Sequence, residues 1–380
     1  MWPESSESQQ PLRNGLTTGS CATACCVAAA RALLADKQPA TVEVSLPRGE
    51  KVNLSILEYS AIERGIRTAT VKDAGDDPDA THGATLFVEL RLTVQPGIVF
   101  KAATGVGTVT REGLVLDIGE PAINPVPRQM MRNHLQHYAH TYHYQGGFEV
   151  SVGIENGEQI AKHTMNGRLG IIGGLSILGT TGIVRPYSCS AYIASIHQGI
   201  DVARANEFTH LAASTGIASE RAIKDHYQMH EISLIEMGDF VGAMLKYLRR
   251  EKIDSRTGKQ IKKLSISAGF GKLTKLANGH LDLNSRQSSI DFQQLADIAG
   301  MLGASASLQN ELLNANTSIE VLNKSNAVGL DIATVICKNA LAVARNIVHE
   351  SIDIEVWAVD RKGLFVANSY GHTFKKGIKQ

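Results

Sequence analysis

The sequence has few aromatic residues and almost no net charge. Phe, Trp and Tyr make up 5% of the 380 residues, and 38 basic residues stand against 37 acidic ones, which gives a formal net charge of +1. This balance argues against a nucleic-acid-binding protein that relies on bulk charge. It remains compatible with a local basic pocket for a small anionic ligand.

The sequence also lacks a long apolar run. No stretch of 18 uninterrupted apolar residues occurs, so no membrane span and no membrane partner are predicted. The apolar segment 21–35 is interrupted by Thr23 and Arg31, and it follows a polar start without a basic region. It therefore lacks the pattern of a signal peptide, and a cytoplasmic location is expected.

Cysteines are few and odd in number. Five occur in the chain, and without a signal sequence they favour reduced thiols over a disulfide framework. Cys21 and Cys25 would share one face of a helix, but no His or further Cys follows at the spacing of a zinc site. Small buried thiols are the preferred interpretation, and no metal site is predicted.

The pattern of polar and apolar residues changes near Tyr187, from short alternating segments to apolar runs separated by helical segments. This change predicts two domains, 1–187 and 188–380. In the first domain, an Ala-rich helix follows residues 17–20 and a second helix covers residues 125–142. Alternating polar and apolar residues predict antiparallel strands at 42–46, 52–56, 87–92 and 148–152. The first domain is therefore expected to be α+β.

In the second domain, short apolar runs alternate with helical segments, one of which extends from Phe240 to Arg250. This alternation predicts an α/β domain with a parallel sheet whose faces are covered by helices. The expected strands are residues 209–214, 232–236, 264–267 and 352–359.

Five Gly-rich or polar blocks resemble the signature blocks of the CbiD family and occur in the order of that family. They are residues 15–22, 71–79, 122–128, 168–184 and 271–277. The resemblance implies a methyltransferase that moves a methyl group from S-adenosylmethionine to C-1 of cobalt-precorrin-5B in corrin-ring biosynthesis. It also implies an N-terminal domain similar to a circularly permuted ribosomal protein S5 domain 2, and a C-terminal four-stranded parallel sheet.

The macrocycle implied by the resemblance carries several carboxylates, so cations and backbone amides are the expected contacts. Acidic residues next to Lys72 could orient that lysine or bind a cation. The substrate-binding candidates are Thr17, Thr18, Gly19, Ser20, Lys72, Asp76, Asp77, Arg128, Arg168, Thr180, Thr181, Arg185, Lys272 and Lys275.

Each group of candidates has a purely structural alternative. The helix start at 17–20 is also typical of a capped core helix, and the acidic segment 72–79 of a solvated turn. The glycines at 173–182 allow close backbone approach to a ligand but also suit a tight crossover between domains. Residues 270–275 also suit a solvated helix start.

The donor site is expected in domain 188–380, and the corrinoid in domain 1–187. Gly216 follows the first strand of the second domain, and Glu236 ends the next strand, 236 − 216 = 20 residues later. An acidic residue at this place commonly binds ribose hydroxyls, although the single glycine leaves the fingerprint incomplete and a surface Glu is the alternative. The donor-binding candidates are Thr215, Gly216, Glu236, Gly238 and Asp239.

No catalytic residue is assigned. Family members commonly carry His where this chain has Asn284, and His280 is not assumed to replace it. Histidines recur every third residue from His134 to His143; a half-exposed helix face is preferred there over a metal or cobalt ligand.

Two other functions are open from the sequence alone. One is a small-molecule phosphotransferase, because domains similar to ribosomal protein S5 domain 2 occur in small-molecule kinases. The other is a non-catalytic carrier of a corrinoid intermediate. A homo-oligomer is also compatible with the sequence.

Overall fold

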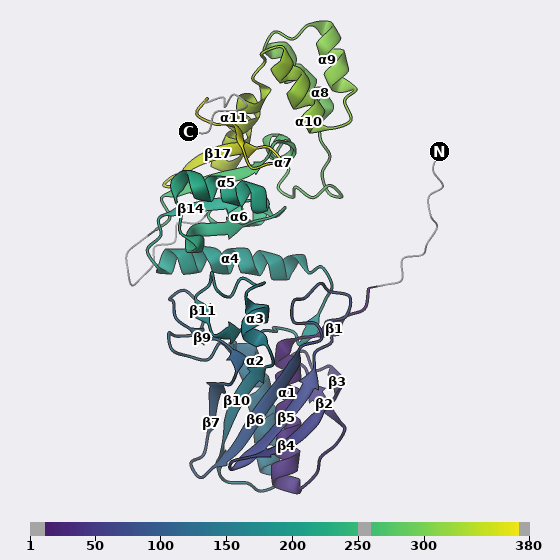
Figure 1. Ribbon diagram of the computed structural model, residues 1–380, viewed down its shortest axis with the longest axis vertical. Helices are drawn as coiled ribbons and strands as arrows, with labels where there is room; N and C mark the ends of the chain where they lie inside the picture. Colours follow the sequence, from purple (N-terminus) through teal and green to yellow (C-terminus); the bar gives the residue numbers. More distant parts are fainter. Residues whose placement is uncertain (1–11, 250–259, 372–380) are drawn as a thin grey trace, which may run out of the picture. The chain divides into compact units, whose positions relative to one another are not determined.

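The structure is a computed structural model, and it describes residues 12–249 and 260–371 (Figure 1). The chain divides into two compact units, unit 1 (Met1–Cys189) and unit 2 (Ser190–Gln380). The division falls two residues beyond the predicted boundary at Tyr187. Each unit has a hydrophobic core of its own.

Unit 1 is built around the helix α1 (Thr18–Ala35). Residues 18–30 are all buried, because their small side chains let α2 (Pro125–Thr141) and the main sheet approach closely. By length and composition alone α1 could cross a membrane, but 72% of its apolar window is buried inside the unit. Its burial is that of a core helix, as the Ala-rich pattern predicts.

The main sheet of unit 1 has the strand order β4-β5-β6-β10-β7. All neighbours in it are antiparallel except β10 and β7, which are parallel. The predicted strands 87–92 and 148–152 lie in β6 and β10. The sequence did not predict the other three strands. The bounds are β4 Glu58–Ile62, β5 Gly65–Val71, β6 Thr85–Thr93, β7 Ile98–Ala102 and β10 Gly147–Ile154.

Smaller elements complete unit 1. The predicted strands 42–46 and 52–56 form a separate antiparallel pair, β2 (Thr41–Ser45) and β3 (Lys51–Ser55). Three further pairs are two residues long on each side: β1 (Gly15–Leu16) with β13 (Ile183–Val184), β8 (Gly105–Val106) with β12 (Gly174–Leu175), and β9 (Thr108–Val109) with β11 (Ile171–Ile172). The short helix α3 covers Gly157–Ala161.

Unit 2 contains a five-stranded sheet with the order β15-β14-β16-β17-β18. The first four strands in this order are parallel, and β18 is antiparallel to β17. The four expected parallel strands are present, but the sheet has a fifth strand that the sequence did not predict, the short antiparallel β18 at the edge next to β17. The bounds are β14 His210–Ser214, β15 Leu234–Glu236, β16 Lys263–Gly269, β17 Asp353–Val359 and β18 Phe365–Asn368.

Helices cover both faces of this sheet, which agrees with the predicted α/β pattern. Ala212 packs with Ile223 of α5 on one face, whereas Leu211 and Ala213 belong to the larger core on the other face. The predicted helix from Phe240 to Arg250 is α6, but it is shorter than expected: it ends at Tyr247, and residues 248–249 form a turn, while Arg250 lies outside the described residues. The bounds are α4 Cys189–Ala205, α5 Ile217–Tyr227, α6 Val241–Tyr247, α7 Phe270–Ala277, α8 Phe292–Met301, α9 Ala306–Leu313, α10 Ser318–Ala327 and α11 Ile332–Arg345.

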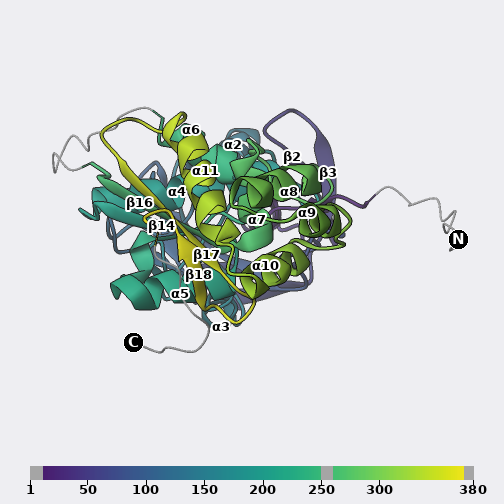
Figure 2. The same ribbon diagram turned by 90° about the horizontal axis from the view of Figure 1, so that it is seen from above.

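The strand order creates a switch point between β14 and β16. From β14 the chain passes through α5 and a turn of 3-10 helix at Glu231–Ser233 to β15 on one side. It then passes through α6 and returns to β16 on the other side. Figure 2 shows β14, β16, β17 and β18 of unit 2 side by side. Open α/β sheets bind ligands beyond the carboxyl ends of their strands at such a point.

Candidate functional site

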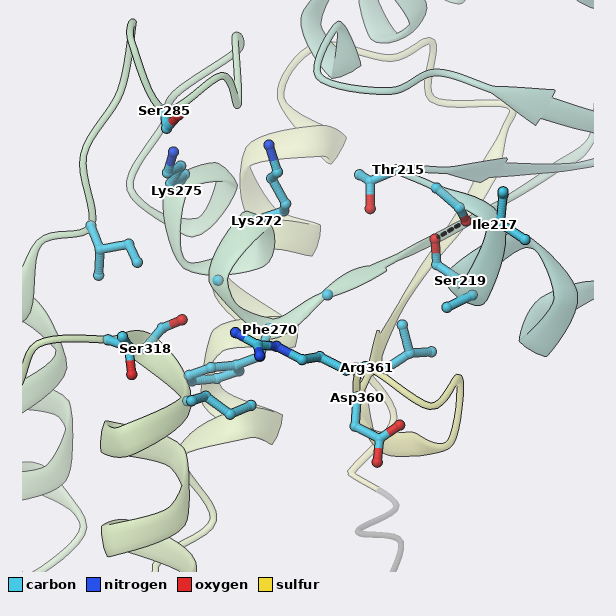
Figure 3. A pocket seen from close by; sticks show the side chains of 18 residues that line it. Thr215, Ile217, Ser219, Phe270, Lys272, Lys275, Ser285, Ser318, Asp360 and Arg361 are labelled. Carbon is cyan, nitrogen blue, oxygen red and sulfur yellow. Dashed lines mark hydrogen bonds between the residues drawn. The ribbon is translucent and has the colours of Figure 1, made fainter.

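A cavity of about 500 Å³ lies at the carboxyl ends of the parallel strands of unit 2 (Figure 3). Its wall is formed by the loops after β14, β16 and β17 and by the start of α10, with residues 215–219, 269–272, 359–361 and 317–319. The cavity therefore lies at the switch point between β14 and β16. Its volume is within the range of small-molecule sites.

Three helices begin at the wall of this cavity. Helix α5 follows Gly216, α7 follows Gly269, and α10 follows Thr317. The first amides of a helix lack intrahelical partners and carry the positive end of the helix dipole. A Cβ atom built on Gly216 or Gly269 would meet nothing within 4 Å, so the backbone at both positions is open to a ligand.

Basic side chains also line the cavity. The Lys272 ammonium pairs with Asp239 and donates to the Leu283 carbonyl oxygen at 3.0 Å. Lys275 donates to the same oxygen at 3.1 Å and is 6% exposed. Burial, and then the charge of Lys272, lower the pKa of Lys275. Arg361 is a third cation in the wall.

The five donor-binding candidates fall into two groups. Thr215 and Gly216 line the cavity, whereas Glu236, the last residue of β15, and Gly238 and Asp239, which follow that strand, are outside the cavity wall. Burial raises the pKa of Tyr192 to about 12, and the carboxylates of Glu236 and Asp239 contribute to this shift. The carboxyl edge of the sheet therefore has an acidic side near β15 and a basic side near β16.

In unit 1, the start of α1 at residues 17–20 is hydrogen-bonded to the block 168–184, called the Gly-rich block. The amides of Thr17 and Gly19 donate to the carbonyls of Gly182 and Leu178 at 3.0 and 2.9 Å. The Ser20 amide donates to the Thr17 hydroxyl at 3.2 Å, and the Thr18 hydroxyl bonds to the backbone of Leu178. Because these amides already have protein acceptors, the geometry favours a capped core helix over a carboxylate site.

The acidic segment 72–79 is largely occupied by internal contacts. Lys72 is 2% exposed, and its ammonium bonds to Asp79 and to the Thr81 hydroxyl. Asp76 accepts from the Arg13 amide at 2.6 Å, and Asp77 accepts from the Tyr187 amide at 2.8 Å. The segment therefore orients Lys72 within the fold, and Lys72 is placed as an internal cation.

The remaining candidates of unit 1 differ in accessibility. Arg128 donates to the carbonyls of Ile123 and Pro121 at 2.7 and 3.0 Å and pairs with Glu120, which fixes it to the loop before α2. Thr180 and Arg185 are exposed. Thr181 bonds to the backbone of Ile183, and Arg168 is half-buried and has an interaction partner. Contact of these residues with a substrate stays a prediction.

In the Gly-rich block, the segment that approaches the glycine backbone closely belongs to the protein itself and is not a ligand. A Cβ atom on Gly174 would lie 2.2 Å from the Gly105 carbonyl oxygen, whereas one on Gly173 would meet nothing within 4 Å. Gly173 has a φ of +87°, in the left-handed region that favours glycine. Gly174 is therefore required for the pairing of β12 with β8, and Gly173 is the glycine that is open.

Two polar positions singled out in the sequence have structural roles. His134 accepts from the Ser45 amide at 3.0 Å, and its other ring nitrogen lies 2.8 Å from the Met130 carbonyl oxygen. Asn284 accepts from the Arg286 amide at 2.9 Å and shapes the loop that brings Ser285 to the cavity. Among residues 12–249 and 260–371, no group of three or more His, Cys, Asp or Glu side chains is placed to hold a metal ion.

The sequence did not single out several residues of the cavity wall, such as Thr317, Ser318 and Arg361. Arg361 had a detectable signal, because it lies two residues beyond the end of β17 and hence at the ligand-binding edge of a parallel sheet. Thr317 and Ser318 had none, because they belong to a helical segment with no adjacent strand.

Comparison with known proteins gives a consistent result. The family model described as CbiD matches residues 5–186, and the model described as CbiD, C-terminal domain, matches residues 282–370. A protein of Marinomonas sp. (strain MWYL1), named cobalt-precorrin-5B C(1)-methyltransferase, is 63% identical over 375 residues, which cover 97% of each chain. The protein of the same name from Burkholderia thailandensis is 56% identical over 366 residues, covering 96% of this chain and 99% of the relative.

A solved structure also matches. It is a crystal structure of a cobalamin biosynthesis protein (cbiD) from Archaeoglobus fulgidus, with a TM-score of 0.38 and 26% identity, covering 68% of this chain and 78% of that chain. The identity of the curated relatives over nearly the whole length is the finding that assigns the family. The chain belongs to the CbiD family.

Proposed function

We propose that this chain methylates C-1 of cobalt-precorrin-5B, with S-adenosylmethionine as methyl donor, to give cobalt-precorrin-6A in cobalamin biosynthesis. The observation that carries the proposal is the 63% identity, over 97% of both chains, to a relative named for this methyl transfer. The chain is thus a methyltransferase, and its reaction requires a methyl donor.

The cavity of unit 2 fits the proposed donor. S-adenosylmethionine supplies a methyl group activated by a sulfonium sulfur. The open backbone at Gly216 and Gly269 leaves room for close contact, and Phe270, Ile319 and Val359 give the wall an apolar part that excludes water. Glu236, at the acidic edge beside β14, is the candidate partner of ribose hydroxyls.

Methyl transfer here is proposed to depend on positioning. The family resemblance implies a histidine at position 284, where this chain has Asn, so no imidazole is offered for proton transfer at that position. Holding two reactants in a productive geometry supplies up to about 7–11 kcal/mol of rate acceleration in well-oriented systems. The residues of the cavity therefore bind, orient and exclude water, and no general base is assigned to them.

The two units are proposed to divide the ligands. Unit 2 holds the donor, and unit 1 supplies most contacts to the carboxylates of the corrinoid, with Thr180 and Arg185 as its exposed candidates. The likeness of unit 1 to a permuted ribosomal protein S5 domain 2 and a cytoplasmic location remain part of the proposal.

Incubation of the purified protein with cobalt-precorrin-5B and S-adenosylmethionine tests the function. The corrinoid is expected to gain the mass of one methyl group while an equal amount of S-adenosylhomocysteine forms. A parallel reaction with the cobalt-free macrocycle determines whether the metal is required. Tight corrinoid binding without a mass gain would instead identify a carrier, and ATP consumption with an alcohol substrate would identify a phosphotransferase.

A further inference from the structure

Lys275 is a buried cation that forms no ion pair among the described residues, although the charges of Asp239 and Asp282 act on it without direct contact. It is 6% exposed and lines the cavity of unit 2. Among the described residues its ammonium makes one hydrogen bond, to the Leu283 carbonyl, and no ion pair. Since an ammonium has three donors, two of them are left for another acceptor. Burying a charge without a counter-ion is costly, and the lowered pKa of Lys275 reflects this cost.

The neighbouring lysine, Lys272, takes up the nearby carboxylate of Asp239, so this carboxylate does not form an ion pair with Lys275. Lys272 pairs with Asp239 and shares the Leu283 carbonyl with Lys275. Figure 3 shows both lysines extending in the same direction from α7. Their shared acceptor holds the two ammonium groups close together, so Asp239 compensates only one of the two charges.

Apart from the two lysines, the charged side chains of the wall are Arg361 and Asp360. Arg361 is exposed at the cavity and forms no ion pair within the described part of the chain. Asp360, the acidic residue of the wall, accepts hydrogen bonds from the amides of Lys362 and Leu364 at 2.8 and 2.9 Å, which tie it into its own turn. The three helix starts at the wall contribute the positive ends of their dipoles as well.

We propose that Lys275, with Arg361 in support, binds a carboxylate group of a ligand in this cavity. The proposal rests on the proposed function, because both reactants of that methyl transfer carry carboxylates. One source is the amino-acid end of S-adenosylmethionine, and the other is an acetate or propionate side chain of the corrinoid. A carboxylate completes the ion pair that Lys275 lacks and accepts its unused donors.

Two pairs of probes distinguish the sources in binding measurements on the full-length protein. S-adenosylhomocysteine carries the amino-acid carboxylate, and 5′-methylthioadenosine has the same adenosyl thioether without it. Cobyrinic acid carries free side-chain carboxylates, and cobinamide carries amides in their place. Calorimetry with each probe on the wild type and on Lys275→Met gives the contribution of the ammonium to each.

Lys275→Met is expected to weaken the binding of one carboxylate-bearing probe by about 10-fold or more. The affinity for its carboxylate-free counterpart should change by less than about 2-fold. A selective loss with S-adenosylhomocysteine assigns the site to the donor, and a selective loss with cobyrinic acid assigns it to the corrinoid. Lys275→Arg, which keeps the charge, is expected to recover part of the affinity. Equal changes for both members of each pair, or no change, overturn the proposal.

Two controls keep the test decisive. Lys224→Met removes a lysine of the same unit that pairs with Glu231 at 3.0 Å, away from the cavity, and should leave all four affinities unchanged. If Lys275→Met does not fold, Arg361→Gln is used in its place, because Arg361 is exposed and its replacement does not disturb the core. Arg361→Gln should weaken the binding of one carboxylate-bearing probe by about 3-fold or more, and an unchanged affinity refutes the proposal. A selective loss in a protein whose wild type transfers no methyl group would support the carboxylate site and refute the proposed function.

Discussion

Glu355→Gln is expected to destabilise unit 2 by about 3 kcal/mol at neutral pH. Glu355 lies in β17 and is 0% exposed. One of its carboxylate oxygens accepts hydrogen bonds from the hydroxyls of Ser265 and, at 2.6 Å, Tyr227. The other lies 3.1 Å from the Lys263 ammonium. Replacing the carboxylate by an amide removes the charge that these donors stabilise.

The magnitude follows from the ionisation of Glu355. Burial alone would raise its pKa, but the hydrogen bonds from Ser265 and Tyr227, together with the nearby polar groups of Trp357 and Lys263, outweigh burial and lower the pKa from 4.5 to about 2. The difference is about 2.5 units, and at 1.36 kcal/mol per unit this corresponds to about 3 kcal/mol. Lys263 is partly exposed, so solvent screening makes this an upper value.

The direction of the pKa shift of Glu355 predicts how the stability of unit 2 changes with pH. Because the folded pKa lies below the unfolded value, the stabilisation is fully present above pH 4.5 and is lost as the pH falls towards 2. The difference in stability between wild type and Glu355→Gln should therefore shrink over this range. A difference that stays constant down to pH 2 would show that the charge is not its source.

Tryptophan fluorescence makes the measurement specific to unit 2. The chain has two tryptophans, and in a Trp2→Phe background only Trp357, two residues from Glu355, reports unfolding. Urea titrations at pH 7 and pH 3 compare the two proteins, with Glu311→Gln as matched control. Glu311 is 52% exposed and pairs with Lys324, so its replacement should change stability by less than about 1 kcal/mol. Equal unfolding midpoints for Glu355→Gln and wild type at pH 7 would refute the reasoning.

Three further predictions concern the two units separately. Gly174→Ala should lower the free energy of unfolding of unit 1 by about 1–3 kcal/mol, because the new Cβ would collide with the backbone. The melting temperature of unit 1 should fall accordingly. Gly167→Ala is the control and should have a much smaller effect, because a Cβ there meets open space. Under native conditions only Cys189 should react with Ellman's reagent, because burial raises the pKa of the other four thiols; a second thiol that reacts as fast would contradict the described burial. Glu236→Ala should weaken S-adenosylhomocysteine binding far more than Arg168→Ala in calorimetry, and the reverse order would show that the ligands are assigned to the wrong units.

The sequence predicted the elements whose pattern is set by local burial. The helix α2 begins at its predicted proline, and β14, β16 and β17 appear as apolar runs because helices cover both faces of their sheet. The strand β5 was missed because it packs small and polar residues such as Thr68 and Thr70 against the main core, so no alternation of large apolar residues marks it. The strand β18 was missed because it has four residues and a polar end.

The candidate site was predictable only where it follows a strand. Thr215, Gly216, Lys272 and Lys275 were expected near the sheet edge, and they line one cavity. The contacts that neutralise Lys72 and fix Arg128 depend on how the loops close, which no periodicity in the sequence encodes. Cations that the sequence presents as equivalent are therefore separated by the fold into internal ion pairs and cavity groups.

The bonds between the start of α1 and the Gly-rich block also constrain how the chain is made. Thr18 exchanges hydrogen bonds with Leu178, which lies 160 residues later. At about 5–20 residues per second, a ribosome needs roughly 10–30 s to add that stretch. During this interval the first turn of an apolar helix has no partner at its end. The contacts at the start of α1 can therefore form only when the last short strand of unit 1, β13, has been synthesised, so the nascent chain must keep this end of the helix open until the unit is nearly complete.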